Sequence, residues 1–191
     1  PLHDEELVLL KDAVNILRQI SELSIIHDID SIVSKLENTI VAGQQSNHSI
    51  VQFEKHTFST GSAYIDDIFT AIKAGISLEI DYQPFNKEEP YYWTIHPYLL
   101  KEYRNRWFLI GRFSNMQNLV TIALDRIKKI KPSPEEYISN DLFDSENFFN
   151  NLIGITLPEG ESVSDIIINV KPKQAPYILT KPIHFSQKVL N

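Results

Sequence analysis

Apolar residues recur at helical spacing near the start of the chain, after the possible N-cap Asp4: Leu7, Leu10, Val14, Leu17 and Ile20. A second helix is predicted from residue 28 or 30 to Gly43, because glycine commonly ends a helix. A polar loop follows, and residues 49–58 are predicted to be extended. Residues 61–75 then predict a short amphipathic helix with four inward side chains: Tyr64, Ile68, Phe69 and Ile72.

From Ile76 the apolar spacing changes from helical to alternating, which predicts a strand over residues 76–82. Four more strands are predicted over residues 91–96, 106–112, 119–124 and 128–131. The segments between them, including residues 101–105, have the composition of turns. Five short strands joined by hairpins favour a small antiparallel barrel or curled sheet, because too few residues remain to cover both faces of an open one.

The pattern changes again after residue 137. A helix is predicted over residues 145–152, a turn over 158–160, an apolar strand over 163–170, a second helix over 171–178 and the approach to another strand after 181. These elements predict a small α/β unit that is incomplete at its end. The chain begins with Pro1 in a helical pattern, so we interpret it as a fragment that lacks an N-terminal module.

Composition narrows the class of protein. The 191 residues suffice for one domain or two small ones, and no apolar stretch approaches the roughly 20 residues of a membrane span. The first residues have no signal-peptide pattern, which argues against export. The absence of cysteine excludes disulfides and thiolate chemistry and suits a cytoplasmic location. The six histidines show no zinc-binding spacing, and no catalytic signature or phosphate-binding loop occurs, so neither a metal nor a cofactor is predicted.

Charge is distributed unevenly along the sequence. The chain has a formal net charge of -7, yet residues 101–131 contain eight basic and two acidic residues. A concentrated basic segment in an acidic protein can hold a small anion or a short single strand, although the molecule as a whole repels duplex DNA.

Basic and aromatic residues alternate within residues 95–112. Arginine matches phosphate oxygens in pairs, and aromatic faces stack on bases, so this mixture suits a nucleotide or single-stranded nucleic acid. The continuous apolar run of residues 107–110 favours a core position for these four residues. For the cations, the alternative that they are simply solvated stays open. Asp125 beside Arg126 likewise has a purely structural reading, in which the charged pair orients a turn.

Four segments occur in an order and spacing that resemble the WYL domain family: residues 80–82, 96–99, 106–109 and 124–127. The Trp-Tyr-Leu triplet that names the family corresponds to Trp107-Phe108-Leu109, where phenylalanine lacks the tyrosine hydroxyl. The resemblance implies an α+β protein in three parts: a helical linker and dimerisation region (1–73), a small Sm-like, SH3-type antiparallel β-barrel (74–137) and a partial α/β C-terminal extension (138–191).

This resemblance also implies a function. The implied protein is a homodimeric bacterial transcriptional regulator that senses a nucleotide or short single-stranded nucleic acid. It would bind promoter DNA through an N-terminal winged helix-turn-helix that is absent from this chain. The implied ligand surface consists of Tyr82, His96, Tyr98, Lys101, Arg104, Arg112 and Arg126. Two alternatives stay open: a phosphoryl-transfer or nucleic-acid-processing enzyme that uses His96 for proton transfer, and a module that only mediates protein assembly.

Overall fold

The computed structural model describes residues 6, 61–156 and 162–190, which fall into two compact units that divide between Ser139 and Asn140. The two helices and the extended segment predicted before residue 61 lie outside these residues, apart from Glu6. Described helices and strands occur together, so the α+β class is confirmed. In the described part of the chain, no helix has the length and apolar character needed to cross a bilayer.

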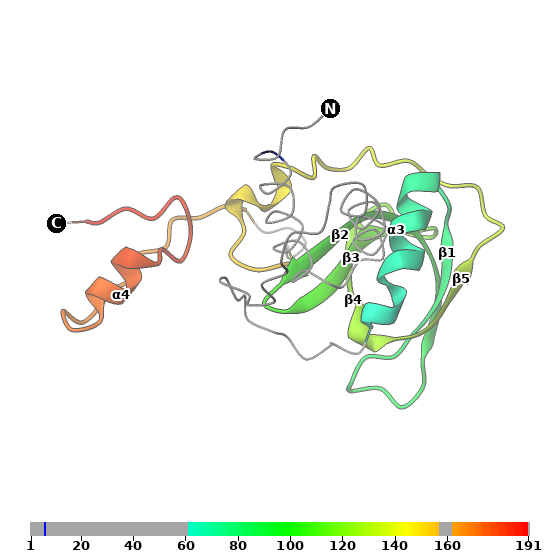
Figure 1. Ribbon diagram of the computed structural model, residues 1–191, viewed down its shortest axis with the longest axis horizontal. Helices are drawn as coiled ribbons and strands as arrows, with labels where there is room; N and C mark the ends of the chain where they lie inside the picture. Colours follow the sequence, from blue (N-terminus) through cyan, green and yellow to red (C-terminus); the bar gives the residue numbers. More distant parts are fainter. Residues whose placement is uncertain (1–5, 7–60, 157–161, 191) are drawn as a thin grey trace. The chain divides into compact units, whose positions relative to one another are not determined.

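The first unit is built on five antiparallel strands (Figure 1). Their bounds are β1 (Leu78–Tyr82), β2 (Tyr91–Tyr103), β3 (Arg106–Phe113), β4 (Leu119–Ala123) and β5 (Ile127–Pro132). They form one sheet in the order β4-β3-β2-β1-β5. All five predicted strands are present. The alternation of apolar and polar residues along the sequence is a reliable signal for a strand with one buried face.

Closure into a barrel, the second part of that prediction, is not found. Strands β4 and β5 are the two edges of the sheet and do not pair with each other. The chain passes from β4 to β5 through the 3-10 helix η2 (Leu124–Arg126). One helix covers one face of the sheet and a segment after β5 crosses part of the other, so the five strands do not need closure to bury their apolar residues.

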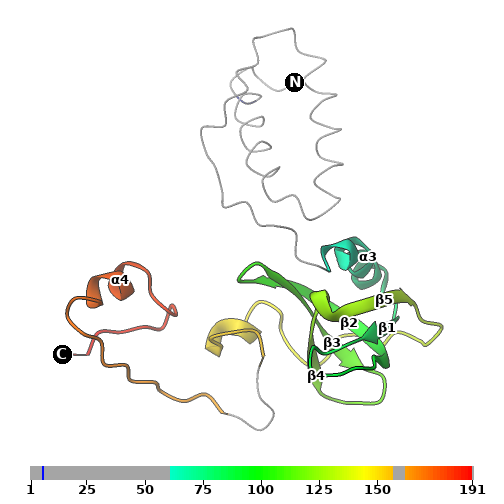
Figure 2. The same ribbon diagram turned by 90° about the horizontal axis from the view of Figure 1, so that it is seen from below.

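Helix α3 (Ile65–Ala74) covers the inner face of the sheet and follows the 3-10 helix η1 (Ser62–Tyr64), as Figure 2 shows. Ile65 and Ile68 are fully buried in the core cluster that also contains alternate residues of β1, and each contributes roughly 1.5–3 kcal/mol by leaving water. Of the other residues predicted to face inward, Tyr64 and Ile72 pack against this core, whereas Phe69 is half-buried with Lys73 over its ring. The helix ends at Gly75, whose left-handed backbone (φ 62°) caps it as expected.

Strand β2 is longer than predicted, since residues 101–103 continue it instead of forming a turn. Tyr103 pairs with Arg106, so only Arg104 and Asn105 turn the chain, both with positive φ (49° and 64°). The tightest hairpin turn has two central residues and needs a positive φ at both, so it usually contains Asn-Gly. A register shift between Pro97 and Leu99 further changes which β2 side chains face the helix.

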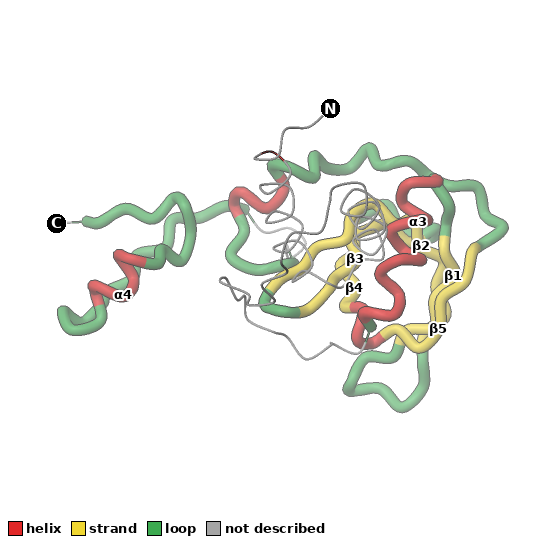
Figure 3. Tube along the Cα trace, viewed as in Figure 1, coloured by secondary structure: helices red, strands yellow, loops and turns green. Residues whose placement is uncertain are grey.

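After β5 the chain runs as loop, seen in Figure 3, and residues 133–138 cross the outer face of β2. We call these six residues the strap. Ser133 donates its backbone N–H to the Ser77 carbonyl at 2.8 Å, and the Ser77 hydroxyl donates to the Glu135 carbonyl at 2.6 Å. These bonds fix the start of the strap beside β1.

The second unit contains the 3-10 helix η3 (Phe148–Asn151) and helix α4 (Ala175–Thr180). Helix α4 confirms the helix predicted over 171–178, with a later start. The helix predicted over 145–152 is reduced to η3, and described residues 162–170 and 182–190 contain no strand where strands were predicted. A strand needs a partner for its backbone hydrogen bonds, and an apolar run cannot specify one.

Candidate functional site

The seven predicted ligand residues lie on three strands, one hairpin turn and η2. Three of them are buried: Tyr82, His96 and Tyr98. Lys101, Arg112 and Arg126 are half-buried, and Arg104 is exposed at the β2–β3 turn. The predicted set is thus divided between packing positions and solvent-accessible cations.

His96 is fully buried, and both of its ring nitrogens are hydrogen-bonded within the protein. Nδ1 accepts the backbone N–H of Ile138 at 3.1 Å, and Nε2 lies 3.0 Å from the Ser114 hydroxyl oxygen. Burial lowers the pKa of His96; the charge of Glu135 acts in the opposite direction, and Arg112 lowers it further. A neutral, fully bonded ring is suited to holding the chain together.

The two buried tyrosines pack against other aromatic rings. Tyr82 stacks on Trp93 with 5.5 Å between ring centroids, and Tyr98 meets Tyr137 edge-on at 6.2 Å. Such contacts add about 0.5–1.5 kcal/mol beyond area burial. Both tyrosines therefore have a structural role in this unit.

The cations of the β2–β3 hairpin do not converge on one point. Arg106 and Arg112 lie on the same face of β3 but six residues apart, which is roughly 20 Å along a strand. Arg112 opposes His96 and donates from Nε to the Met116 carbonyl at 2.8 Å, while the Arg104 guanidinium lies over the Tyr103 ring. The hairpin therefore carries a row of cations instead of a single basic pocket.

Two arginines do meet at η2, on either side of Asp125. Arg106 Nη1 lies 3.5 Å from Asp125 Oδ2, and Arg126 Nε lies 3.9 Å from Asp125 Oδ1. Pairing of Phe108 with Ala123 brings the start of β3 beside η2 and so places Arg106 there. The site thus holds two guanidinium groups and one carboxylate.

An exposed aromatic ring completes this group. The Arg126 guanidinium lies over the Phe85 ring, 4.8 Å from its centroid, and Phe85 is 75% exposed. The backbone N–H of Gln83 donates to the Arg126 carbonyl at 2.9 Å, which holds the β1–β2 loop against η2. We call Phe85, Arg106, Asp125 and Arg126 the η2 site.

The charged groups of the η2 site have unused hydrogen-bonding capacity. Asp125 Oδ1 and Arg126 Nε are both buried and have no hydrogen-bond partner, and their 3.9 Å separation is too long for a bond between them. The side chain of Asp125 is only 12% exposed. Leaving such groups unbonded is unfavourable, and the attraction between the two opposite charges offsets only part of that cost.

More aromatic surface lies on the same β1–β2 hairpin. Tyr91 and Tyr92 are 39% and 72% exposed. Tyr91 stacks almost parallel on Trp93, with 5.0 Å between centroids and 8° between planes. Exposed aromatic rings of this kind are surfaces on which nucleic-acid bases can stack.

Three residues of the η2 site, Phe85, Arg106 and Asp125, were absent from the predicted ligand surface. Arg106 carried a signal, because it belongs to the basic segment 101–131. Phe85 carried none, since it lies in a polar loop whose position beside Arg126 depends on the pairing of distant strands.

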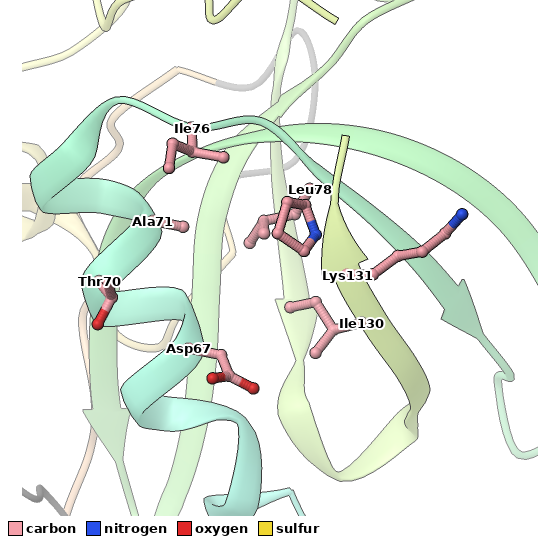
Figure 4. Close-up of a pocket in the computed structure, with 8 residues that line it drawn as sticks. Asp67, Thr70, Ala71, Ile76, Leu78, Ile130 and Lys131 are labelled. Atoms are coloured by element: carbon pink, nitrogen blue, oxygen red, sulfur yellow. The ribbon is translucent and has the colours of Figure 1, made fainter. Parts of the chain in front are cut away.

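A separate pocket of about 250 Å³ lies between α3 and the strands β1 and β5 (Figure 4). Its lining is mainly apolar, with Asp67 pointing into the gap. The Lys131 ammonium points away from it and pairs with Glu79 at 2.6 Å, and this partner raises the pKa of Lys131. An anionic ligand would meet no available cation in this pocket.

No group of three or more His, Asp or Glu side chains suitable for a metal ion exists among the described residues.

Residues 63–132 match the WYL domain family, so the similarity to that family applies to the segment that contains the sheet and the η2 site. Among solved structures, the chain is similar to the proteasome accessory factor B/C (PafBC) of Arthrobacter aurescens, with 20% identity and a TM-score of 0.35. That match covers 37% of this chain and 11% of that one. No curated protein matches the chain.

Proposed function

We propose that this chain is the ligand-sensing region of a bacterial transcriptional regulator, and that it binds a nucleotide or a short single-stranded nucleic acid. The similarity of residues 63–132 to the WYL domain supports a sensing role. The η2 site supports the choice of ligand, since two guanidinium groups and an exposed ring lie together there.

The observation that carries this proposal is the sharing of Asp125 by Arg106 and Arg126. Both guanidinium groups lie within 4 Å of one carboxylate, so both can reach one phosphate placed beside it. A base attached to that phosphate can stack on Phe85, whose face is supported by Arg126.

The row of cations on the β2–β3 hairpin favours an oligonucleotide over a mononucleotide. A mononucleotide reaches only the η2 site, whereas a strand of a few nucleotides can extend from Arg106 toward Arg104 and Lys101 of the same hairpin. Each additional phosphate contact releases counterions and makes binding more dependent on salt.

In this proposal the chain acts as a homodimer in the cytoplasm and controls a winged helix-turn-helix that binds promoter DNA. Ligand binding then has to favour one arrangement of the regulator over another, because equal affinity for both would change nothing.

We assign no enzymatic activity to this site. The enzymatic alternative needs His96 to transfer a proton, but its ring is fully buried and both nitrogens are already bonded. Binding without turnover accounts for the η2 site more simply.

The test is a fluorescence anisotropy titration of a labelled tetrathymidylate with the full chain at two salt concentrations. Arg106→Gln should weaken binding roughly tenfold, as expected for loss of a hydrogen bond to a charged group, and should lower the salt slope by about 1. Lys73→Gln, which removes a cation from α3, is the matched control and should leave binding unchanged. Equal effects of the two variants, or no binding by the parent chain, would refute the proposal.

A further inference from the structure

The strap is held on the outer face of β2 by the side chains of Glu135 and Tyr137 and by the backbone of Ile138. Its Tyr137 hydroxyl donates to the Pro97 carbonyl at 2.8 Å, and its Ile138 backbone N–H donates to His96 Nδ1 at 3.1 Å. The Glu135 carboxylate accepts hydrogen bonds from Ser114 and from Thr94 of β2. The strap also leads directly to Asn140, where the second unit begins.

The hydrogen bonds around His96 determine its tautomer. Nδ1 accepts from Ile138, so it carries no proton, and the single ring proton is on Nε2. Nε2–H therefore donates to the Ser114 oxygen, and the Ser114 hydroxyl proton is directed to the Glu135 carboxylate. Every donor in this chain of bonds has one acceptor.

This arrangement admits no proton on Nδ1. A protonated Nδ1 would face the Ile138 N–H, two donors with no acceptor between them, at a buried position. We propose that the strap is an acid-released latch: a neutral His96 holds residues 133–138 on the sheet, and protonation of His96 frees Ile138 and the segment that leads to the second unit.

The charged and titratable groups around the ring come from three elements. Arg112 opposes His96 on β3 and disfavours its protonation; Glu135 on the strap favours it. Tyr137 on the strap meets the imidazole edge-on at 5.9 Å, and Tyr98 follows on β2. Glu135 itself has a pKa below its usual range, because Ser114 and Thr94 bond its carboxylate, so it stays ionised while His96 titrates.

The direction of the pH effect follows from these groups. Burial lowers the pKa of His96 in the closed strap, whereas an open strap returns it toward 6.5. The open form therefore binds more protons below pH 6.5, and closure weakens as the pH falls from 6.5 to the lower pKa of the closed form. Within that window, opening increases up to tenfold per pH unit.

Amide hydrogen exchange of the full chain, followed by NMR, tests the latch. The protection factor of the Ile138 amide should fall up to tenfold per pH unit below pH 6.5. The protection factor of the Leu109 amide, which is in β3 and buried, should not fall with pH in this way. Ring ¹⁵N shifts of His96 should show an unprotonated Nδ1 at neutral pH and should titrate with the Ile138 amide.

His96→Asn provides the matched variant, since the asparagine Oδ1 can accept the Ile138 N–H at every pH. Protection of Ile138 should then lose its pH dependence. An unchanged dependence in this variant, or equal dependences of Ile138 and Leu109 in the parent chain, would overturn the latch. If the variant does not fold, the parent chain still provides a test. A proton found on His96 Nδ1 at neutral pH would also overturn the latch. No nucleotide is needed, so the result is independent of the proposed ligand.

Discussion

The guanidinium of Arg126 lies over the ring of Phe85, 4.8 Å from its centroid, although the two residues belong to different connections of the sheet. Phe85 is in the β1–β2 loop, and Arg126 is in η2 between β4 and β5. The backbone hydrogen bond from Gln83 to the Arg126 carbonyl joins the same two connections. The contact between Arg126 and Phe85 combines a cation and an aromatic face in one place, which gives the η2 site its proposed preference for nucleotides.

Reversal of charge at Arg126 tests the phosphate contact directly. We expect Arg126→Glu to weaken binding of a short oligonucleotide and to flatten its salt dependence, with the slope reduced by at least about 1. The measurement is a titration at several salt concentrations. Unchanged affinity and slope would remove Arg126 from the site.

Truncation of Phe85 tests the stacking contact. Phe85→Ala should weaken oligonucleotide binding by roughly 1–3 kcal/mol, the range found for loss of one base–aromatic stack. Phe185→Ala is a closely matched control, because Phe185 is also 75% exposed but lies in the second unit. Both changes should alter the free energy of unfolding by less than about 0.5 kcal/mol. Equal binding by the two variants would contradict stacking on Phe85.

Neutralisation of Asp125 should strengthen oligonucleotide binding, whereas loss of either arginine should weaken it. Asp125→Asn leaves two guanidinium groups without their shared carboxylate, so phosphate no longer competes with an internal anion. We expect tighter binding of the oligonucleotide at low salt and a smaller gain at high salt. Weaker binding would mean that Asp125 mainly positions the arginines.

Gly61 allows η1 to lie against the backbone of η2. A Cβ at this position would clash with the backbone of Leu124 and Asp125, and φ is also positive (115°). Gly61→Ala should lower the free energy of unfolding by at least about 1–3 kcal/mol and weaken ligand binding. Gly154→Ala, at a positive φ of 133° in open space, separates backbone strain from the clash. Equal losses of stability in both variants would show that the clash is unimportant.

Tyr137 fastens the middle of the strap. Tyr137→Phe removes the hydrogen bond to Pro97 and should lower the free energy of unfolding by about 1 kcal/mol. Burial raises the pKa of Tyr137, so its contribution is present at neutral pH and is lost as the pH rises through the raised value. Urea unfolding followed by tryptophan fluorescence is suitable, because Trp93 and Trp107 both lie in the sheet.

The exposed Tyr177 of α4 provides the control for this change. Tyr177→Phe should leave the unfolding of the sheet within about 0.5 kcal/mol of the parent chain. A loss of stability as large as that of Tyr137→Phe would show that the Pro97 hydrogen bond is not the cause.

The sequence predicts the strands of the first unit well because alternation is a local property. It does not predict the tight β2–β3 turn, since Arg104 and Asn105 lack the glycine that normally marks two positive φ angles. The burial of His96 could not be inferred either. It depends on the strap, whose Ile138 is 42 residues away in sequence.

The candidate site shows the same limit. The basic segment 101–131 correctly indicated cations around the sheet. Of residues 107–110, which were predicted to be core, Leu109 and Ile110 are buried, whereas Trp107 and Phe108 are half-buried. Local sequence patterns could not predict which cations lie close together. The Arg106–Asp125 contact, for example, requires the strand register that pairs Phe108 with Ala123.

The two-residue turn at Arg104 and Asn105 has a kinetic consequence. A hairpin closed so tightly has no slack with which to fold over a bound molecule, so its cations move together with the strands. Capture by this arm would then proceed without a lid-closing step, and the association rate should be governed by diffusion and by attraction between opposite charges.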